Sequence, residues 1–146
     1  MSTTLKDWLN NGWLVRHKTS RQEISDLFAI ADRDVSTAQL ENLPVDWRMS
    51  IAYNAALQSA TAALAASGYR AQRTAQHYRV IQSLEHTIGL AAEVVDQIDA
   101  FRKRNISSYD RPGTVSEKEA GEMLELARYV RQAVEKWLRA NRADLT

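Results

Sequence analysis

The chain has 146 residues, of which 45% are hydrophobic and 25% are charged, and its formal net charge at pH 7 is +1. These values are typical of one globular domain and exclude wholesale disorder. The chain contains no cysteine, which excludes disulfide frameworks, thiolate zinc sites and cysteine nucleophiles. No run of about 18 apolar residues occurs, so we expect a soluble, cytoplasmic protein without a membrane partner.

The charges are unevenly distributed along the sequence. No Asp or Glu occurs between Trp47 and Leu84. Four arginines fall in this stretch, namely Arg48, Arg70, Arg73 and Arg79. Such an asymmetry predicts a positive surface that attracts phosphates. An Ala-rich buried helix followed by a basic loop explains the same distribution equally well.

Residues 1–19 form an N-terminal extension in which residues 4–10 predict a short helix. Ser20, with Glu23 three residues later, is a capping-box signature. Apolar residues at helical spacing then predict a helix that ends at about Leu40. Asp34 falls on its polar side, where we expect contact with solvent.

Two further helices are predicted in the middle of the chain. Pro44 suits the first turn of a helix, and the Ala-rich run from there to Ser67 predicts a central helix whose small side chains allow close packing. From His77 onward, apolar residues recur at helical spacing. His77 falls on the apolar face, where a structural role is favoured over a catalytic one, and His86 is expected to face solvent.

The segment FRKRNISSYD, residues 101–110, concentrates polar and charged groups. It follows an apolar helical stripe and is predicted to close that helix with three cations, Arg102, Lys103 and Arg104. Cations at a helix C-terminus complement the helix dipole, which explains one or two of them. It does not explain why Asn105 and Tyr109 follow so closely.

Ser116 and Glu119 repeat the capping box and begin the longest predicted helix, which runs to about Asn141. Residues 142–146 are expected to form a frayed tail. The pattern therefore predicts an all-α, antiparallel bundle of about five helices, in one domain over residues 20–141.

Several catalytic classes are excluded by missing motifs. A di-iron bundle needs inward Glu-x-x-His pairs, but the residues three before the histidines are Leu14, Thr74 and Ser83. The sequence has no HExxH zinc motif and no Gly-rich phosphate loop, so no metal and no cofactor is expected. A Ser-His-Asp triad remains open, although no nucleophile elbow is present.

The order of the features is informative in itself. A capped first helix is followed by Ala52-Tyr53-Asn54-Ala55 in an Ala-rich second helix, and His77 opens the third. An RN…YD segment and an S-x-x-E-A helix complete the order. Over residues 20–140 this arrangement resembles the HEPN superfamily.

The resemblance implies a small helical bundle that usually dimerises. Many such domains are metal-independent endoribonucleases of toxin–antitoxin and phage-defence systems, often beside a nucleotidyltransferase or antitoxin partner, and others are inactive binding modules.

The family's active-site pattern is an Arg, often followed by Asn, then four to six residues, then a His. Arg104 and Asn105 fit this pattern, but Tyr109 stands where the His is expected, and Arg102 fits the spacing as well. The resemblance thus makes Arg104, Asn105 and Tyr109 candidates for catalysis. Candidates for binding RNA or nucleotide phosphates are Arg102, Lys103, Arg70, Arg73 and His77.

The replacement of His matters because metal-free RNA cleavage requires proton transfer to and from oxygen atoms. Arg is suited to gripping phosphate oxygens, and imidazole exchanges protons near neutrality. A tyrosine is a poor base, although it can donate a hydrogen bond or stack on a nucleobase. Three hypotheses remain: a non-catalytic RNA-binding module, an active endoribonuclease that uses Arg104 and Tyr109 across a dimer, and a structural or protein-interaction bundle.

Overall fold

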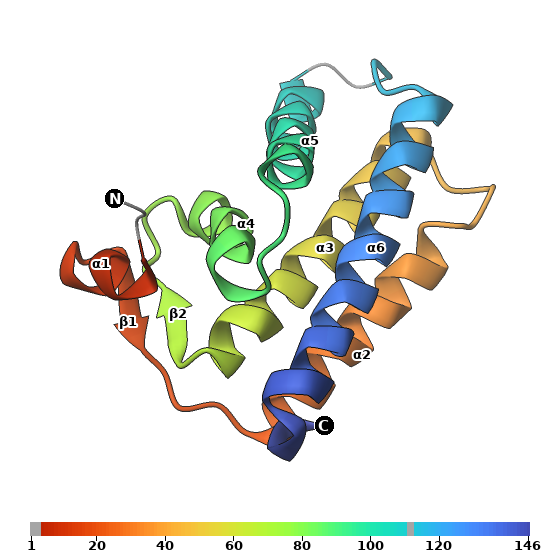
Figure 1. Cartoon of the computed structure of the whole chain (residues 1–146). Helices are drawn as coiled ribbons and strands as arrows, with labels where there is room; N and C mark the ends of the chain where they lie inside the picture. The colour runs from red at the N-terminus through yellow and green to blue at the C-terminus, as the bar shows by residue number, and fades with distance from the viewer. Residues whose placement is uncertain (1–3, 111–112) are drawn as a thin grey trace.

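The computed structural model describes residues 4–110 and 113–146, with backbone alone for residues 107–110. In this part of the chain, α-helices dominate and a two-stranded antiparallel sheet accompanies them (Figure 1). The elements are α1 (Leu5–Asn10), β1 (Leu14–Arg16), α2 (Arg21–Thr37), α3 (Val45–Ala66), β2 (Tyr69–Ala71), α4 (Gln76–Thr87), α5 (Ala92–Asp110), α6 (Glu117–Asn141) and the 3₁₀ turn η1 (Ala143–Leu145). The predicted all-α single-domain bundle is confirmed.

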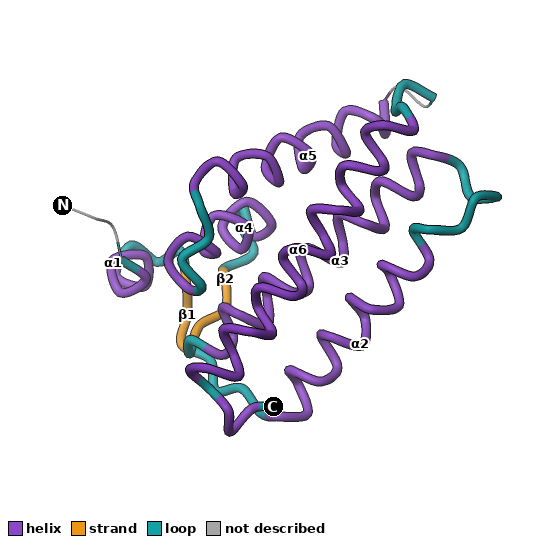
Figure 2. Tube along the Cα trace, turned by 45° about the vertical axis from the view of Figure 1, so that its right-hand side comes forward, coloured by secondary structure: helices purple, strands orange, loops and turns teal. Residues whose placement is uncertain are grey.

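Helix α3 is the centre of the bundle and packs against α2, α4, α5 and α6. Figures 1 and 2 show α2, α3 and α6 running side by side, while α4 and α5 lie on the other side of α3. Alanines occupy most buried positions of α3, so neighbouring helices can approach its axis closely. The helix ends as predicted, because Gly68 adopts a φ of 97° that other residues tolerate poorly.

Both predicted N-terminal caps form. The Ser116 hydroxyl accepts from the Glu119 amide and the Glu119 carboxylate accepts from the Ser116 amide, which completes the capping box of α6. Ser20 caps α2 in the same way, but the Glu23 carboxylate instead accepts from the Thr19 hydroxyl. Helix α2 ends at Thr37, three residues before the predicted end.

Helix α5 differs from the prediction in length. It continues to Asp110, so Arg102, Lys103 and Arg104 lie inside the helix and do not close it. The explanation of these cations by the helix dipole is therefore wrong, because the dipole acts only within the terminal turns.

The N-terminal extension contains a strand, β1, that the periodicity did not predict. Strand β1 pairs antiparallel with β2, with Val15 opposite Arg70. Three residues per strand are too few for an alternation signal. Trp13 of this extension lies under the Arg79 guanidinium, 3.7 Å from the ring centroid. His86, expected in solvent, packs edge-on against Trp8 with ring centroids 5.2 Å apart.

The predicted frayed tail is also wrong. Residues 143–145 form η1, and Leu145 is only 6% exposed. The Arg142 Nη1 atom donates to the Ala66 carbonyl at 2.5 Å. The tail therefore covers the C-terminal end of α3, whose last carbonyls have no partner inside the helix.

Candidate functional site

A polar cavity of about 440 Å³ opens across α3, between α2 on one side and α4 and α5 on the other. Its lining consists of Arg33, Asp34, Ser50, Ile51, Tyr53, Asn54, Leu57, His77, Arg102, Asn105 and Ile106. We call it the α3 cavity. Its size is in the range of small-ligand sites, and three of the predicted site residues, Arg102, Asn105 and His77, lie in it.

Arg102 is held in place by a buried acid on the same helix. Its Nε atom donates to the Asp99 carboxylate at 2.7 Å, and Asp99 is almost fully buried. The Arg102 guanidinium also lies 5.3 Å from the centroid of the Tyr78 ring. Among the described side chains, its terminal nitrogens donate no hydrogen bond. One edge of the guanidinium fork is thus fixed, and the other is available to an oxyanion.

Tyr53 brings a buried hydroxyl to the α3 cavity. The residue is 4% exposed, and within the described residues its oxygen has no hydrogen-bond partner. Burial raises the pKa of this hydroxyl to about 12, although the nearby Arg102 charge partly opposes the shift. Its ring faces the His77 ring at a centroid distance of 6.5 Å. An unpaired buried hydroxyl is costly, and such groups mark sites where a ligand can supply the partner.

The opposite end of the α3 cavity carries a carboxylate. Asp34 is 6% exposed, which corrects the expectation that it faces solvent. Its oxygens accept from Arg33 Nε at 3.0 Å and from Asn54 Nδ2 at 2.7 Å. Asn54 in turn accepts from Gln58 at 3.2 Å. This network fixes the carboxylate and the amide in one orientation.

A second, shallower hollow of about 570 Å³ adjoins the α3 cavity and shares Arg102 and His77 with it. Arg73 from the loop before α4 lines its rim, and no carboxylate residue is among its lining residues. His77 lies on the face of α4 that is turned toward Tyr53 of α3, but its side chain is exposed and not buried. The helix begins only one residue earlier, at Gln76, so His77 belongs to its first turn.

The remaining predicted residues lie elsewhere. Arg104 Nε donates to Glu119 at 2.7 Å, and its Nη2 atom donates to the Thr114 carbonyl, so its guanidinium faces the start of α6. Lys103 is 70% exposed and lies 3.6 Å from Asp99. Arg70 is exposed on β2. The side chain of Tyr109 lies outside the described residues.

The α3 cavity thus combines an arginine, a histidine, a tyrosine hydroxyl and a fixed carboxylate on a helical bundle. The sequence model of the HEPN domain matches residues 24–137. The chain belongs to the HEPN family. A comparison with curated proteins finds no match.

Two kinds of feature are absent from the described residues of this HEPN domain. None of the described helices has the length and the apolar run needed to cross a bilayer. The described residues also include no group of three or more acidic or histidine side chains placed to hold a metal ion.

Sequence reasoning missed Tyr53, Asn54 and Asp34 as site residues. Tyr53 and Asn54 carried part of the family resemblance, but no local pattern marked them as cavity residues. Asp34 is adjacent to charged residues, and such clusters usually form a solvated face. The missing signal was the contact between α2 and α3, which brings Asn54 to Asp34.

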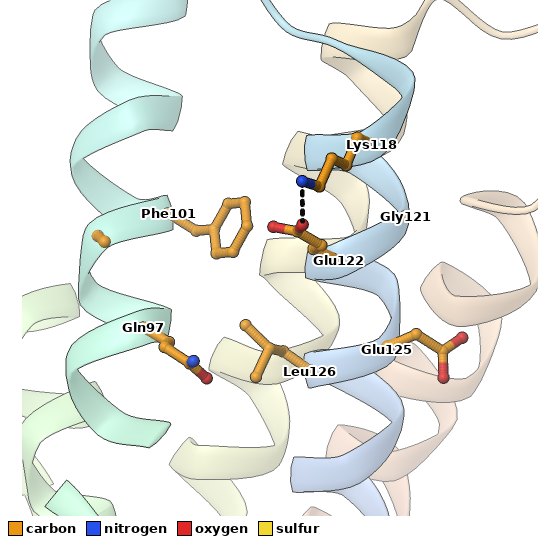
Figure 3. A pocket seen from close by; sticks show the side chains of 8 residues that line it. Gln97, Phe101, Lys118, Gly121, Glu122, Glu125 and Leu126 are labelled. Carbon is orange, nitrogen blue, oxygen red and sulfur yellow. Dashed lines mark ion pairs between the residues drawn. The ribbon is translucent and has the colours of Figure 1, made fainter. Parts of the chain in front are cut away.

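The HEPN domain has another hollow, of about 790 Å³, between α5 and α6. Figure 3 shows the Phe101 ring and Leu126 projecting into it from the two helices, with the Lys118 and Glu122 ion pair beside them. A further hollow farther along α6 is lined by Tyr129, Lys136 and Trp137. The flank of α6 toward α5 is therefore only partly covered.

Proposed function

We propose that this HEPN domain is an RNA-binding module that holds a phosphate at Arg102 beside the α3 cavity. The observation that carries the proposal is that Arg102 and His77, from two different helices, line both the α3 cavity and the adjoining hollow. A phosphate in that hollow would contact Arg102, His77 and Arg73. No carboxylate residue lines the hollow, so no negative side chain there would repel the phosphate. Arg102 offers the fork geometry that suits phosphate oxygens.

Fluorescence anisotropy with a labelled single-stranded RNA tests this proposal. Arg102→Gln should weaken binding and reduce the slope of log affinity against log salt by about one, because one fewer phosphate is neutralised. Lys103→Gln is the matched control, since it removes the same charge one residue away but outside both hollows. Arg73→Gln is a second test. Unlike Arg102→Gln, it does not remove the ion-pair partner of a buried acid. Equal effects of all three changes, or none, would contradict the proposed site.

The runner-up is a metal-independent endoribonuclease, and the position of His77 favours it. In such a reaction the ribose 2′-oxygen loses its proton and attacks phosphorus, and the 5′-oxygen leaves and gains a proton. Imidazole is the side chain best suited to these transfers, and His77 lies beside Arg102. The version with Arg104 and Tyr109 across a dimer is a separate prediction, and the bonds of Arg104 to Glu119 and Thr114 argue for Arg102 in its place.

Incubation of the purified protein with total RNA and tRNA in EDTA distinguishes the two functions. An endoribonuclease should leave 2′,3′-cyclic phosphate ends, and His77→Ala should abolish cleavage while keeping the affinity within a few-fold. His86→Ala is the control because His86 packs against Trp8, away from the cavity. Intact RNA after incubation with protein that binds it supports the non-catalytic module.

We further propose that the chain forms a homodimer through the partly covered flank of α6. Glu122 and Lys136 lie seven residues before and after Tyr129, which is two turns on the same face. An antiparallel pairing of two α6 helices about a two-fold axis at Tyr129 would place each Glu122 opposite the partner's Lys136. Such a self-complementary patch suits an isologous interface.

Sedimentation velocity tests the dimer by charge exchange. Glu122→Lys and Lys136→Glu should each weaken self-association, and the double variant should restore it because the charges again alternate. A monomer at all concentrations would overturn the interface. A nucleotidyltransferase or antitoxin partner, and a role in a toxin–antitoxin or defence-type system, belong to the same proposal and rest on the family resemblance alone.

A further inference from the structure

We propose that the α3 cavity binds a guanine base, presented by RNA or by a free guanine nucleotide. The inference rests on the proposed function, since the phosphate of the same nucleotide would lie at Arg102. It adds a specificity that phosphate binding alone does not provide, because phosphates carry no base identity.

The carboxylate of Asp34 is the first determinant. A carboxylate only accepts hydrogen bonds and has about four lone-pair sites, of which Arg33 and Asn54 use one each. The guanine edge presents two adjacent donors, N1–H and the 2-amino group, which a single carboxylate can accept together. Because Asp34 is buried and fixed by its two partners, its side chain loses little conformational entropy when it accepts those bonds.

The Tyr53 hydroxyl is the second determinant. It lies in the same cavity, is buried, and has no partner among the described residues. Burial raises the pKa of Tyr53 to about 12, so at neutral pH the group keeps its proton and can donate. Guanine offers O6 and N7 as acceptors, and a bond to either would satisfy this hydroxyl.

The mouth of the cavity suits the rest of a nucleotide. The His77 ring is exposed and faces Tyr53, and aromatic rings are common stacking partners for bases in single-stranded RNA. Arg102 lines the same mouth and the adjoining hollow. A nucleotide whose base enters the α3 cavity would therefore carry its phosphate toward the cationic hollow.

The other bases match this set of groups less well. Adenine and cytosine each present an unprotonated ring nitrogen beside their amino group. This nitrogen and an oxygen of the Asp34 carboxylate are both acceptors, so they would face each other without a hydrogen between them. Uracil has one N–H donor between two carbonyl acceptors. Only guanine pairs two adjacent donors with an acceptor for Tyr53.

The experiment compares labelled oligouridine carrying one central guanine, adenine or inosine by fluorescence anisotropy, and GMP with AMP by calorimetry. The guanine oligomer should bind roughly tenfold more tightly than the adenine oligomer, the range that one bidentate base contact provides. Inosine, which lacks the 2-amino group, should fall between them. Asp34→Asn should remove the preference, and Asp26→Asn, an exposed change on the same helix, should leave it intact.

Tyr53→Phe removes only the unpartnered hydroxyl and should reduce the guanine preference without unfolding the protein. A preference for GMP over AMP without RNA binding would support the base site, identify the free nucleotide as its ligand and refute the RNA-binding proposal. RNA binding without any base preference would refute the guanine site and leave phosphate binding in place. A preference that survives both Asp34→Asn and Tyr53→Phe would also refute it.

Discussion

The Arg104 guanidinium lies 2.7 Å from the Glu119 carboxylate and joins the C-terminal half of α5 to the first turn of α6. Glu119 also completes the capping box by accepting from the Ser116 amide. One carboxylate therefore caps α6 and also joins this helix to α5, near the hollow between the two helices. We therefore expect Arg104 to have a structural role.

Arg104→Ala should lower the free energy of unfolding by about 1 kcal/mol, because the lost pair is partly exposed and screened. Urea denaturation measures the change. RNA affinity should stay within a few-fold of the wild type, since the side chain faces α6. Arg139→Ala, which removes a more exposed pair on the far end of α6, should change stability less. Loss of RNA binding at unchanged stability would instead return Arg104 to the functional site.

The stability contributed by Glu119 should depend on pH. The hydrogen bond from Arg104 is the largest cause that lowers the pKa of Glu119 below its ordinary value of 4.5. A lowered carboxyl pKa stabilises the folded state above pH 4.5 and loses this effect as the pH falls through the folded value. The stability difference between the wild type and Glu119→Gln should therefore be largest at pH 7 and shrink below pH 4.5. A difference that stays constant from pH 7 to pH 3 would contradict the linkage.

The helices could be predicted because their signals are local. Gly68 ends α3 and Ser116 begins α6 through backbone and capping preferences that a few residues encode. The length of α5 could not be predicted in this way, because its apolar stripe ends at Phe101 while the helix continues to Asp110. The Arg104 pair with Glu119 supports those extra turns, and it joins residues that no helical period connects.

The candidate site was less predictable than the fold for a related reason. Arg102, Asn105 and His77 were found through the family resemblance, and the structure brings them to one cavity. Asp34 and Tyr53 complete the cavity from α2 and α3, and their roles depend on the packing of those helices against α4 and α5. A sequence pattern within one helix carries no information about such contacts.

The C-terminal turn η1 should contribute measurably to stability. Leu145→Ala should lower the free energy of unfolding by about 2 kcal/mol, because it removes a buried side chain over the end of α3. Leu40→Ala is the control, since more than half of that side chain is exposed, and it should change stability by less than about 0.5 kcal/mol. Equal effects of the two changes in urea denaturation would show that η1 is not docked.

Tyr53→Phe should make the protein more stable by about 1 kcal/mol, because it removes a buried hydroxyl that lacks a partner. The pH dependence sharpens this test. Burial raises the folded pKa of Tyr53 to about 12 from an ordinary value of 10.0, so the unfolded chain loses this proton first and the wild type should lose stability as the pH rises from 10 toward 12.

The Tyr53→Phe protein should not show this loss of stability between pH 10 and pH 12. Tyr129→Phe, a change at an exposed position, should lose stability with rising pH as the wild type does. Chemical denaturation from pH 8 to pH 11.5 measures all three proteins. A lower stability of Tyr53→Phe at pH 8 would show that the hydroxyl makes a favourable bond in the free protein. Such a bond would occupy the donor proposed for guanine, so the same measurement bears on both the packing and the ligand.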